Sequence, residues 1–516
     1  MDPIAATHAL AWLAVASLLL LSAIFGRRSK RQVNLPPGPK PWPIIGNLNL
    51  IGPLPHRSIH QLAQRYGPIM HLRFGSFPVT VASSLEMSKA FLKTHDVALA
   101  DRPKPASGKY TNYNFKNITW SDYGPYWRQI RKICLMELFS AKRMSSYEHI
   151  RKEEMLALMN NLYTSCTRDK QQPIVIKDRI STLSLNVISR MVVGKKYMVD
   201  TEDAIISPDD FKRMLDELFI LSGVYNIGDS IPWLDFLDLQ GYVKRMKKLG
   251  VKLDNFLEHV MNEHTERRQR LKEKFVASDM MDVLLEFADN PDLEVKLGRD
   301  NIKAFTQDLL AGGTESPSVL GEWVLTEILR KPEIFKSATE ELDRVVGKER
   351  WVEENDIQNL PYVRAIVREL MRLHPVAPML VPRLAREDIK VAGYDILKGT
   401  RILVNTATIQ KDPKLWDNPN DFCPERFIGK SIDVKGCDYE LLPFGAGRRI
   451  CPGYPLGLVL VESSLANLLH GFDWKLPPNT KPQDLDMEEV FGLSTPKKIP
   501  LEVVIEPRLP AHLYNI

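Results

Sequence analysis

The sequence lacks the cysteine patterns that define zinc sites and disulfide frameworks. Its 516 residues contain five cysteines, an odd number, scattered along the chain, and no two of them form a Cys-x-x-Cys pair. This usage argues against the common zinc modules and is typical of a reducing compartment. Cys437 lies close enough to Cys451 in the sequence to leave a disulfide open, but we do not expect one.

The chain also has little net charge and no internal repeat. Its 69 basic and 64 acidic residues give +5, without the clustered basic patch of a nucleic-acid-binding protein. We therefore expect no nucleic-acid partner, and at most a weak attraction to acidic membrane or protein surfaces. With 44% hydrophobic and 26% charged residues, the composition is that of a globular protein with a sizeable core.

The one long apolar run lies near the N-terminus. Residues 9–25 are apolar except for two serines, and Arg27, Arg28, Lys30 and Arg31 follow. The run is at the lower limit for a membrane span, and basic residues after it place the rest of the chain in the cytosol. A cleaved signal peptide is the alternative, but its basic residues would precede the apolar run, and here the start carries Asp2. We expect a retained anchor in residues 1–34.

Five prolines make residues 35–43 a stiff spacer, and residues 44–516 are expected to form one catalytic domain. Hydrophobic periodicity predicts a mainly α fold with small β-sheets. The expected helices cover residues 58–66, 243–274, 300–331 and 456–469, the second of them charged enough to be a solvated surface helix, and the expected strands cover residues 69–74, 78–83, 389–396 and 401–405.

One thiol stands in an unusual setting. Phe444, Gly447, Arg449, Cys451 and Gly453 follow the pattern F-x-x-G-x-R-x-C-x-G. Glycines let the backbone turn tightly and bring its N–H groups near the sulfur, and the following helix would place the thiol at a positive dipole end. Such surroundings favour a thiolate, which is the form that binds metals. The alternative is a buried structural cysteine beside a Gly-rich turn.

A second stretch breaks the rules of a packing helix. Residues 311–317 read Ala-Gly-Gly-Thr-Glu-Ser-Pro inside the pattern of residues 300–331, although glycine costs about 1 kcal/mol and proline about 3 kcal/mol in a helix. Pro317 removes the N–H that would bond the carbonyl of Gly313. We expect a flat cofactor or substrate to approach here, with Thr314, Glu315 and Ser316 relaying protons. The alternative is a simple helix break.

Three further patterns accompany these two. Trp127 and Arg131 share a helix face, and so do Glu369 and Arg372. Arg383 ends an apolar, proline-rich loop at residues 374–383. Taken alone, each pattern is common in exposed helices and surface loops.

Together, in this order, the patterns resemble those of the cytochrome P-450 family. The resemblance spans residues 127–453, and the anchor and the Pro spacer extend it to the N-terminus. Within the family, the sequence resembles the plant flavonoid 3'-hydroxylase-like group. It implies haem b with Cys451 as the axial iron ligand. Trp127, Arg131, Arg383, Arg449, Phe444 and Gly447 would contact the haem, and Glu369, Arg372 and Arg426 would form a structural network. Ser316 and Pro317 depart from the family, which usually has threonine, then threonine or serine.

The resemblance implies an endoplasmic reticulum monooxygenase that uses O₂ and electrons from NADPH through cytochrome P-450 reductase. The expected substrate is a small apolar plant metabolite, held by residues 104–123, 374–383 and 490–496. A flavonoid or phenylpropanoid ring hydroxylated at a 3'-type position is the first expectation. Terpenoid oxidation, including C–C cleavage to a homoterpene, a reductase-independent isomerase or dehydratase, and a haem-binding sensor are the alternatives.

Overall fold

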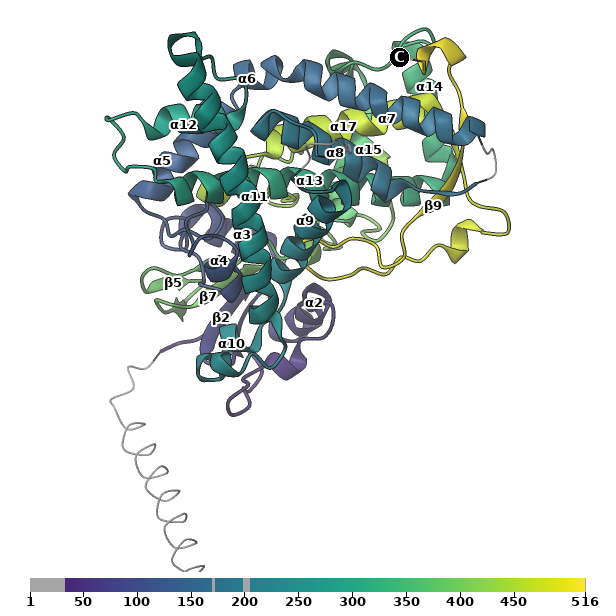
Figure 1. Cartoon of the computed structure of the whole chain (residues 1–516). Helices are drawn as coiled ribbons and strands as arrows, with labels where there is room; N and C mark the ends of the chain where they lie inside the picture. Colours follow the sequence, from purple (N-terminus) through teal and green to yellow (C-terminus); the bar gives the residue numbers. More distant parts are fainter. Residues whose placement is uncertain (1–32, 169–171, 198–204, 516) are drawn as a thin grey trace, which may run out of the picture.

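Helices dominate the computed structural model, which describes residues 33–168, 172–197 and 205–515 (Figure 1). The helices are α2 Pro55–Tyr66, α3 Leu85–Lys89, α4 Ala106–Tyr110, α5 Pro125–Ile133, α6 Ala141–Ser146, α7 Glu148–Arg168, α8 Ile176–Val193, α9 Pro208–Gly223, α10 Ile227–Ser230, α11 Tyr242–Leu271, α12 Met280–Ala288, α13 Arg299–Arg330, α14 Pro332–Val345, α15 Pro361–Leu373, α16 Thr406–Ile409 and α17 Tyr454–Gly471. The strands are β1 Ile69–Phe74, β2 Phe77–Ala82, β3 Ile174–Val175, β4 Arg383–Leu384, β5 Ile389–Val391, β6 Tyr394–Ile396, β7 Arg401–Val404, β8 Phe472–Lys475 and β9 Glu502–Pro507. The expectation of a mainly α fold with small sheets is confirmed.

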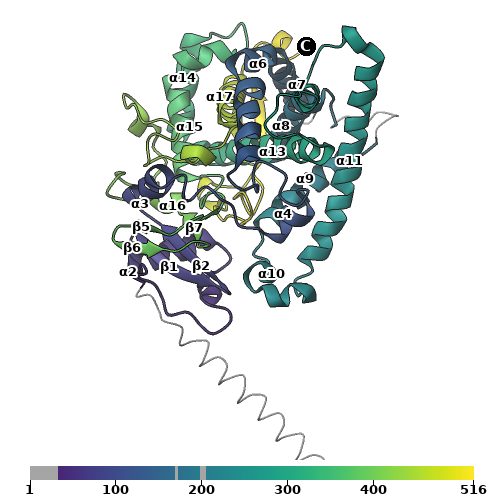
Figure 2. The same ribbon diagram turned by 90° about the vertical axis from the view of Figure 1, so that its left-hand side faces the viewer.

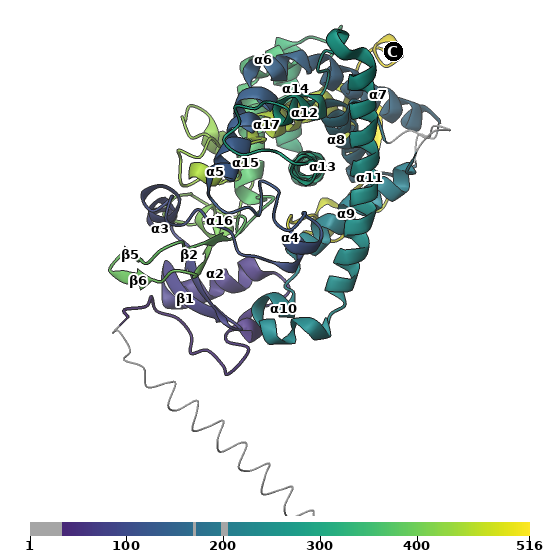
Figure 3. The ribbon, with the colours of Figure 1, turned by 60° about the vertical axis from the view of Figure 1, so that its left-hand side comes forward.

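Helix α13 runs through the centre of the helical body, where Figures 2 and 3 show it surrounded by other helices. It packs most extensively on α8 and also contacts α17, α15 and α11. Two glycines permit the close approach to α8. A Cβ at Gly321 would lie 2.5 Å from Ile180, and one at Gly313 would lie 2.6 Å from Ile188. Gly313 is therefore required by helix packing, whereas a Cβ at Gly312 would point into open space.

The small β region lies at one end of the molecule, beside α2 and α10 (Figure 2). Its sheet has the order β1-β2-β7-β4. β1 and β2 are antiparallel, whereas β2 and β7 are parallel, with Val79 opposite Arg401. Alternate side chains of the two strands, Met70, Leu72 and Phe74 of β1 and Val79 and Val81 of β2, build a hydrophobic cluster with Ile59 of α2. The sheet joins residues that lie far apart in the sequence, such as Val79 and Arg401.

The single strand predicted for residues 389–396 is wrong. Residues 389–396 make a hairpin of β5 and β6, because Ala392 and Gly393 take positive φ angles of 50° and 83°. The pattern expected for residues 243–274 also differs in detail. Helix α11 ends at Leu271, Lys272 has a φ of 45°, and a full apolar face of the helix is buried.

The expected anchor falls almost entirely outside the described residues. In the part of the chain from residue 33 onward that is described, no helix combines the length and the apolar character needed to cross a bilayer. The Pro spacer is described and lies along β1. His71 donates its N–H to the carbonyl of Pro37 at 2.8 Å, and a Cβ at Gly38 would lie 1.9 Å from the carbonyl oxygen of His71. The spacer is thus packed against the sheet.

Candidate active site

Residues 444–453 form a closed loop around the thiol of Cys451. The N–H of Cys451 donates to the carbonyl of Phe444 at 3.0 Å, and Gly445 and Gly447 supply φ angles of 73° and 71°. Gly447 does not line the cavity described below. A Cβ there would lie 2.2 Å from the carbonyl oxygen of Leu92 and 2.6 Å from Asp96, so this glycine seats the loop against residues 90–96.

The thiol opens into a cavity of about 330 Å³ between the loop and α13. Burial raises the pKa of Cys451, while the N–H groups of Gly453 and Tyr454 and the charge of Arg131 act in the opposite direction. Those two N–H groups stand at the start of α17, as the sequence predicted. A thiol in this setting becomes a stable thiolate when a metal cation supplies further positive charge.

Four arginines line the same cavity: Arg102, Arg131, Arg383 and Arg449. Burial lowers the pKa of each, and repulsion from neighbouring guanidinium groups lowers it further for Arg102 and Arg449, the latter to about 9. Arg383 pairs with Asp96 at 2.7 Å. Among the described residues, no carboxylate lies within ion-pair distance of the other three. Clustered buried cations need anionic partners, so the cavity suits a ligand with carboxylate groups.

Backbone carbonyls orient three of these arginines, Arg102, Arg383 and Arg449. Arg449 donates to the carbonyls of Ala100, Ile118 and Ser121 at 2.6 to 3.2 Å, and its guanidinium lies 4.3 Å from the centre of the Trp127 ring. Trp127 donates its Nε1–H to Ile118 at 3.1 Å. Trp127, Arg131, Phe444, Arg449, Arg383 and Cys451 all reach the cavity, so most of the expected cofactor contacts are brought together. The donor set, a thiol and several guanidinium groups that line one cavity, fits haem with its two carboxylates.

Arg102 is a site residue that sequence reasoning missed. It is buried and donates to the carbonyls of Thr119, Val381 and Pro382 at 2.6 to 3.1 Å. It thereby ties one wall of the cavity to the other. No local spacing distinguishes Arg102, because its partners lie far away in the sequence.

Some residues of the 311–317 stretch on α13 reach the cavity and others do not. Gly312, Gly313, Ser316 and Pro317 line it, whereas Thr314 and Glu315 are absent from its wall. Thr314 is buried and donates its hydroxyl to the carbonyl of Leu310 at 2.6 Å. Its hydroxyl is therefore engaged within the helix.

Glu315 lies on another side of α13, beside Ser494. Burial raises the pKa of Glu315, and its Oε2 atom is buried without a hydrogen-bond partner among the described residues. Ser316 is consequently the member of the predicted proton-relay group that the structure brings to the cavity.

Asp308 is a second residue that sequence reasoning missed. It lies on α13 and lines the cavity. It accepts hydrogen bonds from Asn117 Nδ2 at 2.8 Å and from the N–H and hydroxyl of Thr119 at 3.0 Å each. Burial raises its pKa to about 6 despite these donors. Its role is to hold residues 117–119 against α13, and nothing in its helical position alone signals this.

Glu369, Arg372 and Arg426 form the buried network that the sequence predicted. Glu369 accepts two hydrogen bonds from Arg372 at 2.7 and 2.8 Å and one from Arg426 at 3.0 Å. Glu369 and Arg372 are fully buried, and none of the three lines the cavity. They therefore stabilise the scaffold and do not touch the reacting atoms.

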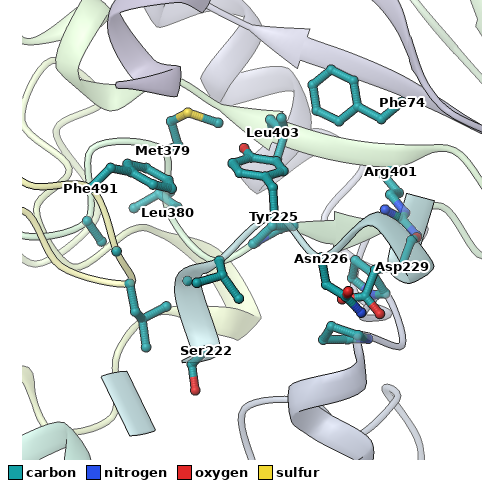
Figure 4. Close-up of a pocket in the computed structure, with 18 of the residues that line it drawn as sticks. Phe74, Ser222, Tyr225, Asn226, Asp229, Met379, Leu380, Arg401, Leu403 and Phe491 are labelled. Carbon is teal, nitrogen blue, oxygen red and sulfur yellow. The ribbon is translucent and has the colours of Figure 1, made fainter. Parts of the chain in front are cut away.

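A second pocket, of about 150 Å³, adjoins the first. Ala377 and Leu380 line both. The three segments predicted to hold substrate meet here: Pro105 and Trp120 come from the first, Met379 from the second and Phe491 from the third. Figure 4 shows this pocket with Tyr225 near its middle.

Comparisons with known proteins point to one family. A sequence model of the family named Cytochrome P450 matches residues 36–503. The chain is 47% identical to "Trimethyltridecatetraene synthase" of Zea mays (95% of this chain, 91% of the relative) and 45% identical to "Dimethylnonatriene synthase" of Zea mays (98% of each). It is 39% identical to "Flavonoid 3'-monooxygenase" of Petunia hybrida (97% and 99%). A solved zebra fish cytochrome P450 with abiraterone superimposes with a TM-score of 0.72 at 25% identity, covering 88% of this chain and 100% of that one.

Proposed function

This chain belongs to the cytochrome P450 family, and from that premise we propose that it is a membrane-bound monooxygenase that oxidises an acyclic terpenoid alcohol. The family makes it a haem-thiolate oxidoreductase. Cys451 and Ser316 line the same cavity, and this observation supports that cavity as the place of the reaction.

The chain's own residues have distinct tasks in this proposal. Cys451 would ligate the iron, and Arg102, Arg131, Arg383 and Arg449 would hold the haem carboxylates. Bound haem supplies the iron that activates O₂ with two electrons. Ser316 Oγ would pass protons to the reacting oxygen, and the carbonyl of Gly313, which has no helical donor at Pro317, would hold a water beside it.

The names of two relatives and the cavity wall support the proposed substrate class. The names of the two Zea mays relatives denote synthases of acyclic, branched polyenes. The α13 wall of this cavity carries the apolar side chains of Phe305, Leu309 and Leu320 beside the polar Asp308 and Ser316. In the proposed cleavage, one C–C bond of the alcohol breaks to give a shorter polyene and a small ketone. O₂ takes two electrons from the substrate and two from NADPH and leaves as two water molecules.

Flavonoid 3'-hydroxylation is the second candidate, and the Petunia hybrida relative favours it. In that reaction one oxygen atom enters a C–H bond of the ring, and the other leaves as water. This chain is 47% and 45% identical to the two relatives named for polyenes and 39% identical to the flavonoid relative. The higher identities favour the terpenoid reaction.

An exposed apolar surface supports membrane association. Trp42, Ile44, Trp233, Phe236 and Leu237 are 47 to 81% exposed. They come from neighbouring segments, because Gly75 donates to Ile45 and Ser76 donates to Ser230, at 3.1 and 2.8 Å. Solvent-exposed aromatic clusters of this kind favour a lipid interface. We place the domain on the cytosolic face of the endoplasmic reticulum, with NADPH-cytochrome P-450 reductase as its electron donor on the side of Cys451.

The test is an assay of the full-length enzyme in microsomes, with and without reductase and NADPH. Acyclic sesquiterpene and diterpene alcohols and a flavonoid panel are offered together, and products are identified by mass spectrometry. We expect polyene formation that requires both NADPH and reductase. Hydroxylated flavonoids alone would establish the second candidate, turnover without reductase would indicate an isomerase or dehydratase, and no product from any substrate would contradict the proposal.

A further inference from the structure

The second pocket is not needed to enclose the haem, yet it forms part of the same interior. Leu380 and Ala377 separate it from the haem cavity and have surface in both. Leu380 has a φ of 51°, a conformation that costs a non-glycine residue energy, and its N–H bonds the carbonyl of Ala377 at 3.0 Å. The backbone thus holds a leucine side chain at the junction of the two spaces.

Aromatic rings wall the outer space. The Tyr225 ring is stacked with Phe491 at 5.9 Å and 22°, and it meets Phe74 edge-on at 6.2 Å. Tyr225 keeps 36% of its surface accessible. Figure 4 shows it between Phe491, Met379 and Leu380 on one side and Phe74 on the other. The side chains at this end are aromatic or aliphatic, and the Tyr225 hydroxyl and the Met379 sulfur are their heteroatoms.

The polar residues of the pocket gather at its other end, where Figure 4 shows Asn226, Asp229 and Arg401. Asp229 and Arg401 have structural partners already, whereas the Nδ2 atom of Asn226 is buried without a hydrogen-bond partner among the described residues. Asp229 accepts the N–H of Ala106 at 2.8 Å, and Arg401 donates to the backbone carbonyl of Asp229 at 2.6 Å. Arg401 also lies 3.9 Å from the centre of the Phe77 ring. Apart from the Nδ2 atom of Asn226, the surface left for a ligand is the aromatic end, which suits a hydrocarbon chain.

We propose that this outer pocket is a tail compartment, which makes the enzyme select acyclic terpenoid alcohols by chain length. The inference rests on the proposed function. The reacting end of the alcohol lies in the haem cavity, and the chain passes Leu380. The distal isoprenoid units of a diterpene alcohol then contact Tyr225, Phe491 and Phe74. A sesquiterpene alcohol is shorter and leaves most of the compartment unused.

A flexible chain fits this arrangement better than a rigid ring system does. The two spaces meet at a junction formed by Ala377 and Leu380, and a chain with single bonds between its isoprenoid units can bend around it. Apolar contacts of each added carbon in a preformed pocket raise specificity by about tenfold or more. The compartment should accordingly favour the longer alcohol.

The experiment fills the compartment and leaves the haem cavity unchanged. Tyr225 and Leu403 line only the outer pocket. Tyr225→Trp replaces its ring with a larger one. Leu403→Phe introduces a ring from β7. Tyr394→Trp, on β6 and outside both pockets, is the matched control for Tyr225→Trp. Each holoenzyme is assayed with an acyclic diterpene alcohol and an acyclic sesquiterpene alcohol, and the binding of both is measured by calorimetry.

We expect kcat/KM for the diterpene alcohol to fall about tenfold in both filling variants, with the sesquiterpene alcohol and the control changed by less than about twofold. An equal loss for the two alcohols would make the pocket a mere entrance path and overturn the inference, and so would no loss. If the wild type binds both alcohols but oxidises neither, the proposed function is wrong, but the tail compartment can still be tested. A filling variant must then weaken binding of the diterpene alcohol about tenfold and binding of the sesquiterpene alcohol by less than about twofold. Binding of neither overturns both.

Discussion

Glu369→Gln removes a single negative charge from the buried network, and we expect it to destabilise the fold by about 3 to 5 kcal/mol. The Glu369 carboxylate accepts from Arg372 twice, from Arg426, and from the N–H of Cys423 at 2.8 Å. Arg372 has no exposed surface, and its remaining bonds reach only backbone carbonyls. Glutamine keeps the volume of the side chain, so the loss comes from an unpaired buried guanidinium facing an amide that also donates.

A surface ion pair provides the matched control. Glu340 and Lys336 lie one helical turn apart on α14, at 3.9 Å, with 67% and 78% of their side chains exposed. Glu340→Gln should therefore cost less than about 1 kcal/mol, because solvent screens the pair. Both variants are measured by denaturant unfolding of the holoenzyme, followed by circular dichroism and by the Soret band.

The same experiment separates scaffold from catalysis. If the network is structural, kcat per bound haem in Glu369→Gln should stay within about twofold of wild type at a temperature where the variant is folded. A loss of stability no larger than that of Glu340→Gln would refute the buried-charge reasoning. Normal stability with kcat lost would show that Glu369 acts on the reaction.

Three further predictions concern the site and its support. Cys451→Ala should abolish the Soret band typical of thiolate ligation in the reduced, carbon monoxide-bound protein, with circular dichroism unchanged; a retained band would assign the ligand elsewhere. Ser316→Ala should raise the hydrogen peroxide formed per NADPH several-fold, whereas Ser316→Thr should not, and equal uncoupling in both would exclude the proton-relay role. Burial raises the pKa of Glu489, but the hydrogen bond from His56 and nearby cations lower it to about 2. Because that pKa lies below the unfolded value, the stability lost in Glu489→Gln should be full at pH 7 and shrink as pH falls from about 4.5 towards 2, which unfolding at several pH values checks.

Local patterns predicted the parts of this site that local chemistry defines. The Cys451 loop depends on glycine backbone angles, and the start of α17 depends on a short apolar run, so both could be read from neighbouring residues. Gly313 shows the limit of such reasoning. Its pattern suggested room for a cofactor, but its missing Cβ mainly accommodates Ile188 of α8. That contact depends on how two helices cross, which no local pattern encodes.

Arg102 and Asp308 escaped prediction for a related reason. Each is defined by partners on distant segments: Val381 and Pro382 for Arg102, and Asn117 for Asp308. Polar residues of this kind become recognisable only once the fold has brought their partners together.

The charges of the cavity link haem binding to the stability of the whole fold. In the protein alone, burial works against the charged forms of Arg102, Arg449 and the Cys451 thiolate at once, because it lowers the pKa of each arginine and raises the pKa of the thiol. In the proposed site, bound haem would offer each of them an opposite charge, two carboxylates for the guanidinium groups and iron for the sulfur. Because a ligand that binds only the folded state stabilises it, haem binding offsets a strain that the sequence builds into its own site. The arginines are held by backbone carbonyls on both sides of the cavity, so that stabilisation reaches residues 100–121 and residues 381–383 together.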